Sequence, residues 1–220
     1  IILINPFNKM HIKFREPVIL PKIIPLYTIE QLLKTLYRQR SLAKTSVQKQ
    51  KALRDIAVVE LLFSTGIRIS ELCSLKSSDV NLQDNTILIF GKGSKERRIQ
   101  ICNEDVLKAL YDYRAGFAKQ ILQCNHFFAT TNGQPLSDQS VRRMLRKYAT
   151  LAGIDMHITP HMFRHTFATS LLETDVDIRY IQEMLGHSSI NITEIYTHVT
   201  TSKQKDILMN KHPRKNLRVE

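Results

Sequence analysis

The chain has 220 residues, of which 43% are hydrophobic, with only seven Gly and seven Pro, a composition typical of a folded globular domain. Thirty-two Lys and Arg against twenty Asp and Glu give a formal net charge of +12, which favours a polyanionic partner, although a solvated basic surface would give the same count. The three cysteines are widely spaced, which argues against disulfides and a zinc site and favours the cytoplasm. No apolar run approaches the roughly 18 residues of a membrane span, so we expect a soluble protein without membrane contact.

The first part of the chain predicts a linker followed by two helices. Residues 1–26 carry four prolines and no sustained helical period, which indicates an extended linker arriving from a preceding domain. Thr28 and Gln31 resemble a capping box that opens a helix, and the polar stretch after this helix predicts an interruption. From about Lys51 an apolar run predicts a second helix that ends before Gly66, a natural C-terminal cap.

The segment from residue 77 to 102 changes character and predicts a small antiparallel β-meander. Its short β-rich runs are broken at residues 84–85 and at the stretch GKGSK of residues 91–95. A helix from about Glu104 to Leu122 is expected to follow this meander.

Local end signals define the remaining helices. Ser137 caps a helix that Gly153 terminates. Thr159 and Pro160 start the next helix, because proline is tolerated at the first helical position. Two shorter helices and a charged tail complete the chain. The expected fold is mostly α with a small antiparallel β-sheet (α+β).

The stretch TPHMFRHTFATSLL, residues 159–172, carries an arginine in an unusual place. At helical spacing its apolar residues cover one wide arc, and His161 and Arg164 fall inside this arc, with His165, Thr166 and Thr169 on the other side. A core-facing arginine needs a partner, since a buried charge is costly. Two interpretations stay open: an internal salt bridge, or a deep anion site that His161 and Arg164 share.

Two further stretches carry candidate cations. In STGIRISEL, Arg68 stands three residues before Glu71, which predicts either a simple ion pair at a helix start or an arginine whose planar fork faces a phosphate. In GKGSK, Lys92 lies between two glycines without the spacing of a nucleotide-binding loop. It is either a solvated hairpin lysine or a mobile one that reaches a leaving oxygen, and Lys95 is the second candidate there.

The stretch LGHSSINITEIYTHV supplies His187 and Tyr196. Taken alone, Tyr196 is most simply a packing residue with a satisfied hydroxyl. As a nucleophile it would have to lose a proton with an ordinary pKa near 10, and nearby cations would stabilise the phenolate. Two arginines, two histidines and a lysine are the groups that a phosphoryl-transfer site built on tyrosine needs.

The ordered set of stretches TGIRISEL, GKGSKER, TPHMFRHTFAT, LGHSSINITEIYTHV and HPR resembles the tyrosine recombinases, the phage integrase family. The resemblance runs from about residue 25 to 214. Within the family, the stretches are similar both to those of bacterial chromosome-dimer-resolution recombinases and to those of mobile-element integrases. It implies a site-specific DNA recombinase that cleaves and rejoins DNA strands without metal or ATP.

The resemblance also implies a role for each residue of the site. Tyr196 would attack the scissile phosphate, forming a 3′-phosphotyrosyl link and freeing a 5′-hydroxyl. Arg68 and Arg164 would clamp the phosphate, and Glu71 would support Arg68. Lys92 would protonate the departing 5′ oxygen. Proton handling and hydrogen bonding would fall to His161 and His187.

Additional contacts with double-stranded DNA are expected on a basic helix and beside the hairpin lysine. The expected contacts are Ser140, Arg142, Arg143, Lys147, Lys95, Arg97 and Arg98. For the helix SVRRMLRK, a merely solvated basic face is the open alternative.

We expect the catalytic domain at residues 27–200 and a C-terminal tail at residues 201–220. The resemblance implies that the tail docks on a neighbouring protomer, within a homo- or hetero-tetramer on DNA, whereas a frayed charged end is the plain alternative. Two rival functions remain: a type IB topoisomerase-like enzyme that nicks and closes DNA, and a catalytically silent DNA-binding module.

Overall fold

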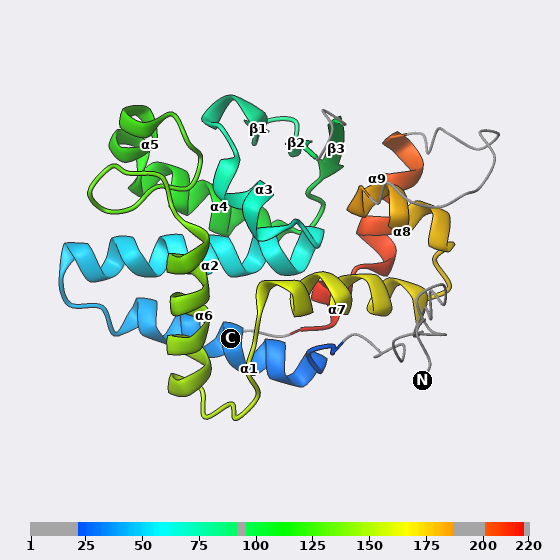
Figure 1. Cartoon of the computed structure of the whole chain (residues 1–220), viewed down its shortest axis with the longest axis horizontal. Helices are drawn as coiled ribbons and strands as arrows, with labels where there is room; N and C mark the ends of the chain where they lie inside the picture. The colour runs from blue at the N-terminus through cyan, green and yellow to red at the C-terminus, as the bar shows by residue number, and fades with distance from the viewer. Residues whose placement is uncertain (1–21, 92–95, 187–200, 218–220) are drawn as a thin grey trace, which may run out of the picture.

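The computed structural model describes residues 22–91, 96–186 and 201–217. Its helices are α1 (Leu26–Ser41), α2 (Ser46–Thr65), α3 (Ile69–Ser74), α4 (Glu104–Gly116), α5 (Ala118–Cys124), α6 (Asp138–Leu151), α7 (Pro160–Leu172), α8 (Ile178–Leu185) and α9 (Thr201–Lys211). Two 3₁₀ turns, η1 (Ser77–Asp79) and η2 (Pro213–Asn216), and three strands, β1 (Val80–Asn81), β2 (Thr86–Phe90) and β3 (Glu96–Gln100), complete the described elements. The mostly helical fold with a small antiparallel sheet is confirmed (Figure 1).

Helix α2 runs through the middle of the molecule (Figure 1). Every residue from Ile56 to Thr65 is buried, because α1, α4 and α7 all pack against this helix. A helix that is covered on all sides needs no polar face, which explains the nearly continuous apolar run that predicted it. One charged residue, Glu60, lies in this run and is 0% exposed, so it requires a buried partner.

The capping box lies at the start of α2 and not at the start of α1, so its predicted position was wrong. Thr45 Oγ1 accepts a hydrogen bond from the backbone N–H of Gln48 at 3.2 Å, and the Gln48 side chain accepts one from the N–H of Thr45 at 3.2 Å. The polar stretch before Lys51 therefore begins a helix instead of interrupting one. Thr28 lies inside α1, which starts after Pro25, and it is buried.

The three strands form the predicted antiparallel meander in the order β1-β2-β3. Across the β2–β3 pair, Ile87 stands opposite Ile99, and Ile89 opposite Arg97. Since side chains alternate between the faces of a strand, Arg97 lies on the same face as the buried Ile99. The neighbouring Arg98 lies on the other face and is exposed.

The single helix expected from Glu104 to Leu122 is two helices. Phe117, with φ −120° and ψ 14°, separates α4 from α5 and is buried. Its ring packs against that of Tyr113 at a centroid distance of 4.8 Å. The break directly follows Gly116, a poor helix former, and the bend places the ring of Phe117 in the core.

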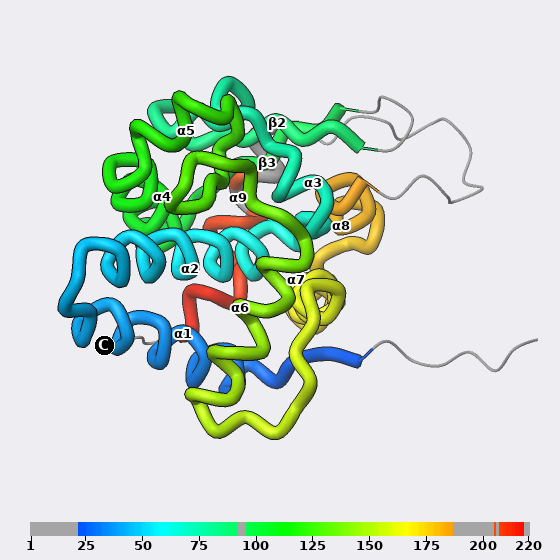
Figure 2. The backbone as a smooth tube through the Cα atoms, turned by 60° about the vertical axis from the view of Figure 1, so that its left-hand side comes forward, coloured from blue at the N-terminus to red at the C-terminus, as the bar shows by residue number. Residues whose placement is uncertain are grey.

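The C-terminal segment returns to the centre of its own chain. In Figures 1 and 2 the red segment leaves α9, passes α2 and ends near α1. We call His212, Pro213 and Arg214, all of which are buried, the C-terminal clip. Arg214 donates from Nε and Nη2 to the two carboxylate oxygens of Glu60, both at 3.0 Å. The described part of the tail is therefore packed against its own chain, not frayed.

The clip residue His212 fits its site only in the neutral form. Its Nδ1 accepts a hydrogen bond from the backbone N–H of Arg214 at 2.9 Å, so its Nε2–H is free to donate to the carbonyl oxygen of Ser64, also at 2.9 Å. Burial lowers the pKa of His212 to about 4 from its ordinary value of 6.5.

Stability of the wild-type chain should fall as the pH falls from 6.5 towards 4, because the unfolded chain binds a proton at His212 that the folded chain resists. The loss attributable to this residue should reach about 3 kcal/mol at the acidic end. Urea unfolding at several pH values should show this component in the wild type and in a control with the exposed His157 changed to Gln, but not in His212→Gln. Equal pH dependence in all three proteins would contradict the prediction.

Candidate active site

Arg68 is positioned by the turn that follows α2. Gly66 ends α2 with a left-handed backbone of φ 59°, and a Cβ at this position would lie 2.7 Å from Leu185 Cδ2, so only glycine fits without a shift. Arg68 then occupies the N-cap position of α3. Its backbone N–H donates to Glu71 Oε2 at 2.9 Å, and its Nη1 donates to Glu71 Oε1 at 2.8 Å. Glu71 thus both caps the helix and orients the guanidinium.

Arg164 reaches the same place from α7. Its side chain is buried, and Nη1 donates to the carbonyl oxygen of Gly66 at 2.8 Å while Nη2 donates to that of Leu185 at 2.6 Å. In the part of the chain that the structure describes, its partners are carbonyl oxygens and not a carboxylate, so the internal salt bridge considered from the sequence is not formed there. Burial, followed by the positive charge of Arg68, lowers the pKa of Arg164 to about 10, which leaves it charged at neutral pH.

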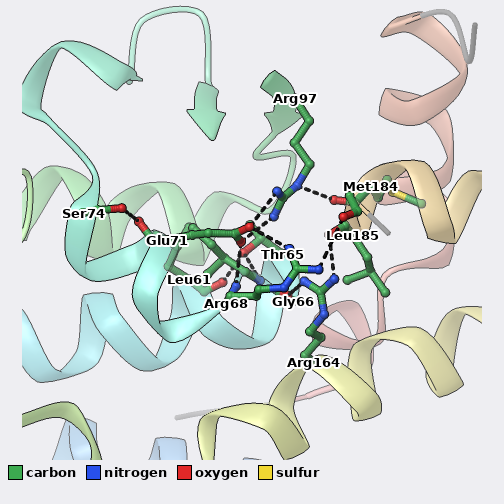
Figure 3. Close-up of polar contacts among 12 residues, drawn as sticks. Leu61, Thr65, Gly66, Arg68, Glu71, Ser74, Arg97, Arg164, Met184 and Leu185 are labelled. Atoms are coloured by element: carbon green, nitrogen blue, oxygen red, sulfur yellow. Dashed lines mark hydrogen bonds and ion pairs between the residues drawn. The ribbon is translucent and has the colours of Figure 1, made fainter. Parts of the chain in front are cut away.

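Three arginines meet at the C-terminal end of α8 (Figure 3). Arg164 donates to Leu185, Arg68 Nη2 lies 3.4 Å from the carbonyl oxygen of Gly186, and Arg97 Nε donates to that of Met184 at 2.9 Å. Carbonyl groups at a helix end are unpaired and carry partial negative charge, which the arginines complement. The three consecutive carbonyls belong to the residues that directly precede His187 in the sequence.

The cluster carries an excess of positive charge. Among the described side chains that meet here, three guanidinium groups stand against one carboxylate, Glu71, to which Arg68 and Arg97 donate, so these four groups carry a charge of two positive units (3 − 1). Burial alone would raise the pKa of Glu71, but hydrogen bonds from Arg97 and Arg68 outweigh burial and hold this pKa below its ordinary value. Glu71 is therefore ionised, and the remaining positive charge makes the cluster a suitable place for an anion.

Comparison with known proteins agrees with this geometry. A sequence model of the phage integrase family matches residues 29–203. The chain belongs to the phage integrase family. It is 73% identical over 216 residues to a tyrosine recombinase of Agathobacter rectalis, covering 98% of this chain and 71% of that protein.

Solved structures of recombinases share the fold. The crystal structure of XerA recombinase has a TM-score of 0.64 and 31% identity, covering 88% of this chain and 67% of that one. The site-specific recombinase XerH, solved with its difH substrate in a pre-cleavage complex, has a TM-score of 0.66 and 25% identity, covering 77% of this chain and 48% of that one.

Among the other catalytic residues expected from the sequence, the structure describes His161. His161 is exposed in the first turn of α7, instead of lying within the buried arc, three residues before the buried Arg164. Thr166, expected on the other side of this helix, is buried and accepts a hydrogen bond from the backbone N–H of Ile24 at 2.7 Å. Four further expected residues lie outside the described part of the chain: Lys92, Lys95, His187 and Tyr196.

The expected DNA contacts differ in their surroundings. On α6, Arg142, Arg143 and Lys147 are exposed, while Ser140 is half-buried with its Oγ 2.9 Å from that of Ser137. Arg98 is exposed on the outer face of β3. Arg97 is different, because its side chain is 10% exposed and its guanidinium is already bound to Glu71 and Met184. The DNA contact expected of Arg97 stays a prediction, and the partners seen here hold its guanidinium inside the molecule.

Within the described ranges, no group of three His, Cys, Asp or Glu side chains is arranged to hold a metal ion. No helix in these ranges is both long and apolar enough to cross a membrane.

Proposed function

We propose that the chain is the DNA-cleaving and strand-joining part of a site-specific DNA recombinase of the cytoplasm, with Tyr196 as its nucleophile. The observation that carries this proposal is the convergence of Arg68 and Arg164 on adjacent carbonyls at the end of α8. Two fixed guanidiniums at one place form a clamp for a phosphate, and Tyr196 lies only ten residues beyond Gly186 in the sequence. The family membership and the DNA complex of XerH support DNA as the substrate.

In the proposed reaction, Tyr196 Oη forms a bond to the scissile phosphorus while the bond from phosphorus to the 5′ oxygen breaks. Lys92 gives a proton to the departing 5′ oxygen, and the phenol proton passes to a histidine, His161 or His187. The phosphotyrosyl link conserves the energy of the phosphodiester, so a 5′-hydroxyl from a partner strand can reverse the step without ATP. Arg68 and Arg164 stabilise the charge that develops on the non-bridging oxygens.

Strand exchange is favoured over simple nicking and closing, because the relatives of the chain are named recombinases. We further propose direct DNA contacts from Lys95 and Arg98, and from Ser140, Arg142, Arg143 and Lys147 on α6. Residues 1–26 would join a preceding DNA-binding domain. Residues 201–220 would join the protomers of a homo- or hetero-tetramer on DNA. In the single chain, Arg214 of this tail is bound to Glu60.

The nucleophile can be tested with a nicked DNA duplex from which the cleaved end diffuses away, trapping a covalent complex. The duplex should carry a site selected by the wild-type chain from random-sequence DNA. We expect a protein–DNA adduct on denaturing gels for the wild type and for Tyr180→Phe, a matched control on α8, and none for Tyr196→Phe. An adduct of normal yield in Tyr196→Phe would overturn the assignment.

A further inference from the structure

Arg97 lies inside the molecule although it follows a hairpin turn. It stands opposite Ile89 on the inward face of β3, and its side chain is only 10% exposed. A guanidinium in such a place needs a complete set of partners, because desolvation of an arginine is costly.

Its partners connect three elements of the site (Figure 3). Arg97 Nη1 and Nη2 donate to Glu71 Oε1 at 3.0 Å and Oε2 at 2.7 Å, which is a two-pronged arginine–carboxylate pair. Its Nε donates to the carbonyl oxygen of Met184 at 2.9 Å. Glu71 in turn binds the backbone and side chain of Arg68. Arg97 therefore joins β3 to the carboxylate that orients Arg68 and to the end of α8.

The guanidinium of Arg97 is also confined sterically. Gly186 ends α8 with φ 65°, and a Cβ on this residue would lie 2.9 Å from Arg97 Nη1 and 3.1 Å from its Cδ. The backbone of Gly186 thus packs against Arg97, and only glycine permits this approach without a shift.

A purely structural pair would not explain the second arginine on Glu71. One guanidinium is enough to neutralise a carboxylate that is 7% exposed, and adding another charge of the same sign near Arg164 is unfavourable without an anion. The second arginine does supply geometry, because the fork of Arg97 binds both oxygens of Glu71 and fixes the plane of this carboxylate, to which Arg68 donates from its backbone N–H and from Nη1.

We propose that Arg97 is a positioning residue for strand cleavage, holding Glu71 so that Arg68 faces the scissile phosphate and fixing the end of α8 that leads to His187. This role rests on the proposed recombinase function. It replaces the direct DNA contact that the sequence suggested for Arg97.

The first test uses the free protein and does not depend on DNA cleavage. Nitrogen-15 relaxation of the Arg68 Nε–H group should report a restrained side chain in the wild type and a mobile one in Arg97→Gln. Arg54→Gln is the matched control, since Arg54 is also a poorly exposed arginine that binds a carboxylate, Asp55, with two donors. If Arg68 stays as restrained in Arg97→Gln as in the wild type, the proposal is overturned, whatever the DNA assay gives.

The second test measures the rate of covalent complex formation at saturating nicked duplex. We expect Arg97→Gln to slow this rate on the order of 10²-fold, because small misplacements of a catalytic group have effects of this size. Arg97→Lys should fall between Arg97→Gln and the wild type, and Arg54→Gln should match the wild type. A wild-type rate in Arg97→Gln would contradict the proposal.

A substrate with a methylphosphonate at the scissile position separates positioning from general destabilisation. This group lacks one negative charge, so its cleavage depends less on correctly placed arginines. The deficit of Arg97→Gln should therefore shrink at least about tenfold on this duplex. An equal deficit on both duplexes would show that Arg97 does not act through the arginine clamp.

Gly186→Ala provides an independent approach to the same contact. The new methyl group should displace the Arg97 guanidinium and slow cleavage of the bound duplex. Gly153→Ala is its control, because Gly153 also has a positive φ, 66°, but has no atom within 4 Å of an added Cβ. Equal cleavage by the two variants would count against the proposal.

Failure of the proposed function would look different. If the wild type formed no adduct, or if Tyr196→Phe still formed one, the proposed function would be refuted. The Arg68 relaxation result would then decide the role of Arg97.

Discussion

Arg164→Lys should slow covalent complex formation on the nicked duplex by about 10²–10³-fold, the usual effect of removing one well-placed donor from a charge-stabilising site. Lysine keeps the positive charge but has a single ammonium group, whereas the guanidinium of Arg164 donates at once to Gly66 and Leu185. Lysine therefore cannot hold both carbonyls and also face a phosphate. The rate should be measured at saturating duplex, so that weaker DNA binding does not contribute.

The same substitution is expected to lower stability, because a buried carbonyl that loses its donor costs about 1–3 kcal/mol. Arg54→Lys is again the matched control: it alters a poorly exposed arginine outside the arginine cluster and should leave the cleavage rate of the bound duplex unchanged. Thermal unfolding of both variants would establish that they are folded at the assay temperature. Near-wild-type cleavage by folded Arg164→Lys would contradict the clamp role.

Much of the arginine cluster was predictable because its members stand in short, recognisable stretches. The spacing of Arg68 and Glu71 predicts a contact across one helical turn, and the structure confirms it. The misfit of Arg164 with its apolar neighbours predicts a buried cation, which the structure also confirms. The carbonyl partners of Arg164 were not predictable, since they belong to α8 and to the turn after α2, which only the folded chain brings together.

The inward direction of the Arg97 side chain has a physical reason. Arg97 follows a Gly-rich stretch in the sequence, but strand alternation decides the direction of its side chain. Ile99 and Ile101 are buried, so counting back by two places Arg97 on the inner face and Arg98 on the outer one. This signal was available in the sequence, whereas the pairing of Arg97 with Glu71 depends on how the sheet packs on α3.

Helix ends followed the same division between local and long-range causes. Ser137, Gly153 and Pro160 mark ends that depend on a few neighbouring residues, and all three were predicted correctly. The break at Phe117 also has a local signal, Gly116, which the expectation of one helix overlooked. The clip depends on a contact between Arg214 and Glu60, which are 154 residues apart. No local pattern specifies such a contact.

Arg214→Met should lower the free energy of unfolding by about 3–5 kcal/mol, because it leaves the carboxylate of Glu60 buried without a cation. Glu60 is 0% exposed, and its remaining side-chain partner is the hydroxyl of Tyr37, 3.0 Å from Oε1. Urea unfolding of the full chain measures the loss directly. Lys215→Met, at an exposed neighbouring position, is the control and should change stability by less than about 0.5 kcal/mol.

The double variant Glu60→Leu/Arg214→Met shows what the ion pair contributes beyond neutralising a buried charge. Apolar residues of similar size often replace a buried ion pair at little cost, so the double variant should recover most of the stability that Arg214→Met loses. Recovery would mean that the ion pair adds little stability of its own and mainly specifies where the C-terminal clip packs. A contact between Leu and Met lacks the two-pronged geometry by which Arg214 binds Glu60. If the double variant were as unstable as Arg214→Met alone, the loss would come from packing around Arg214 and not from the unpaired carboxylate.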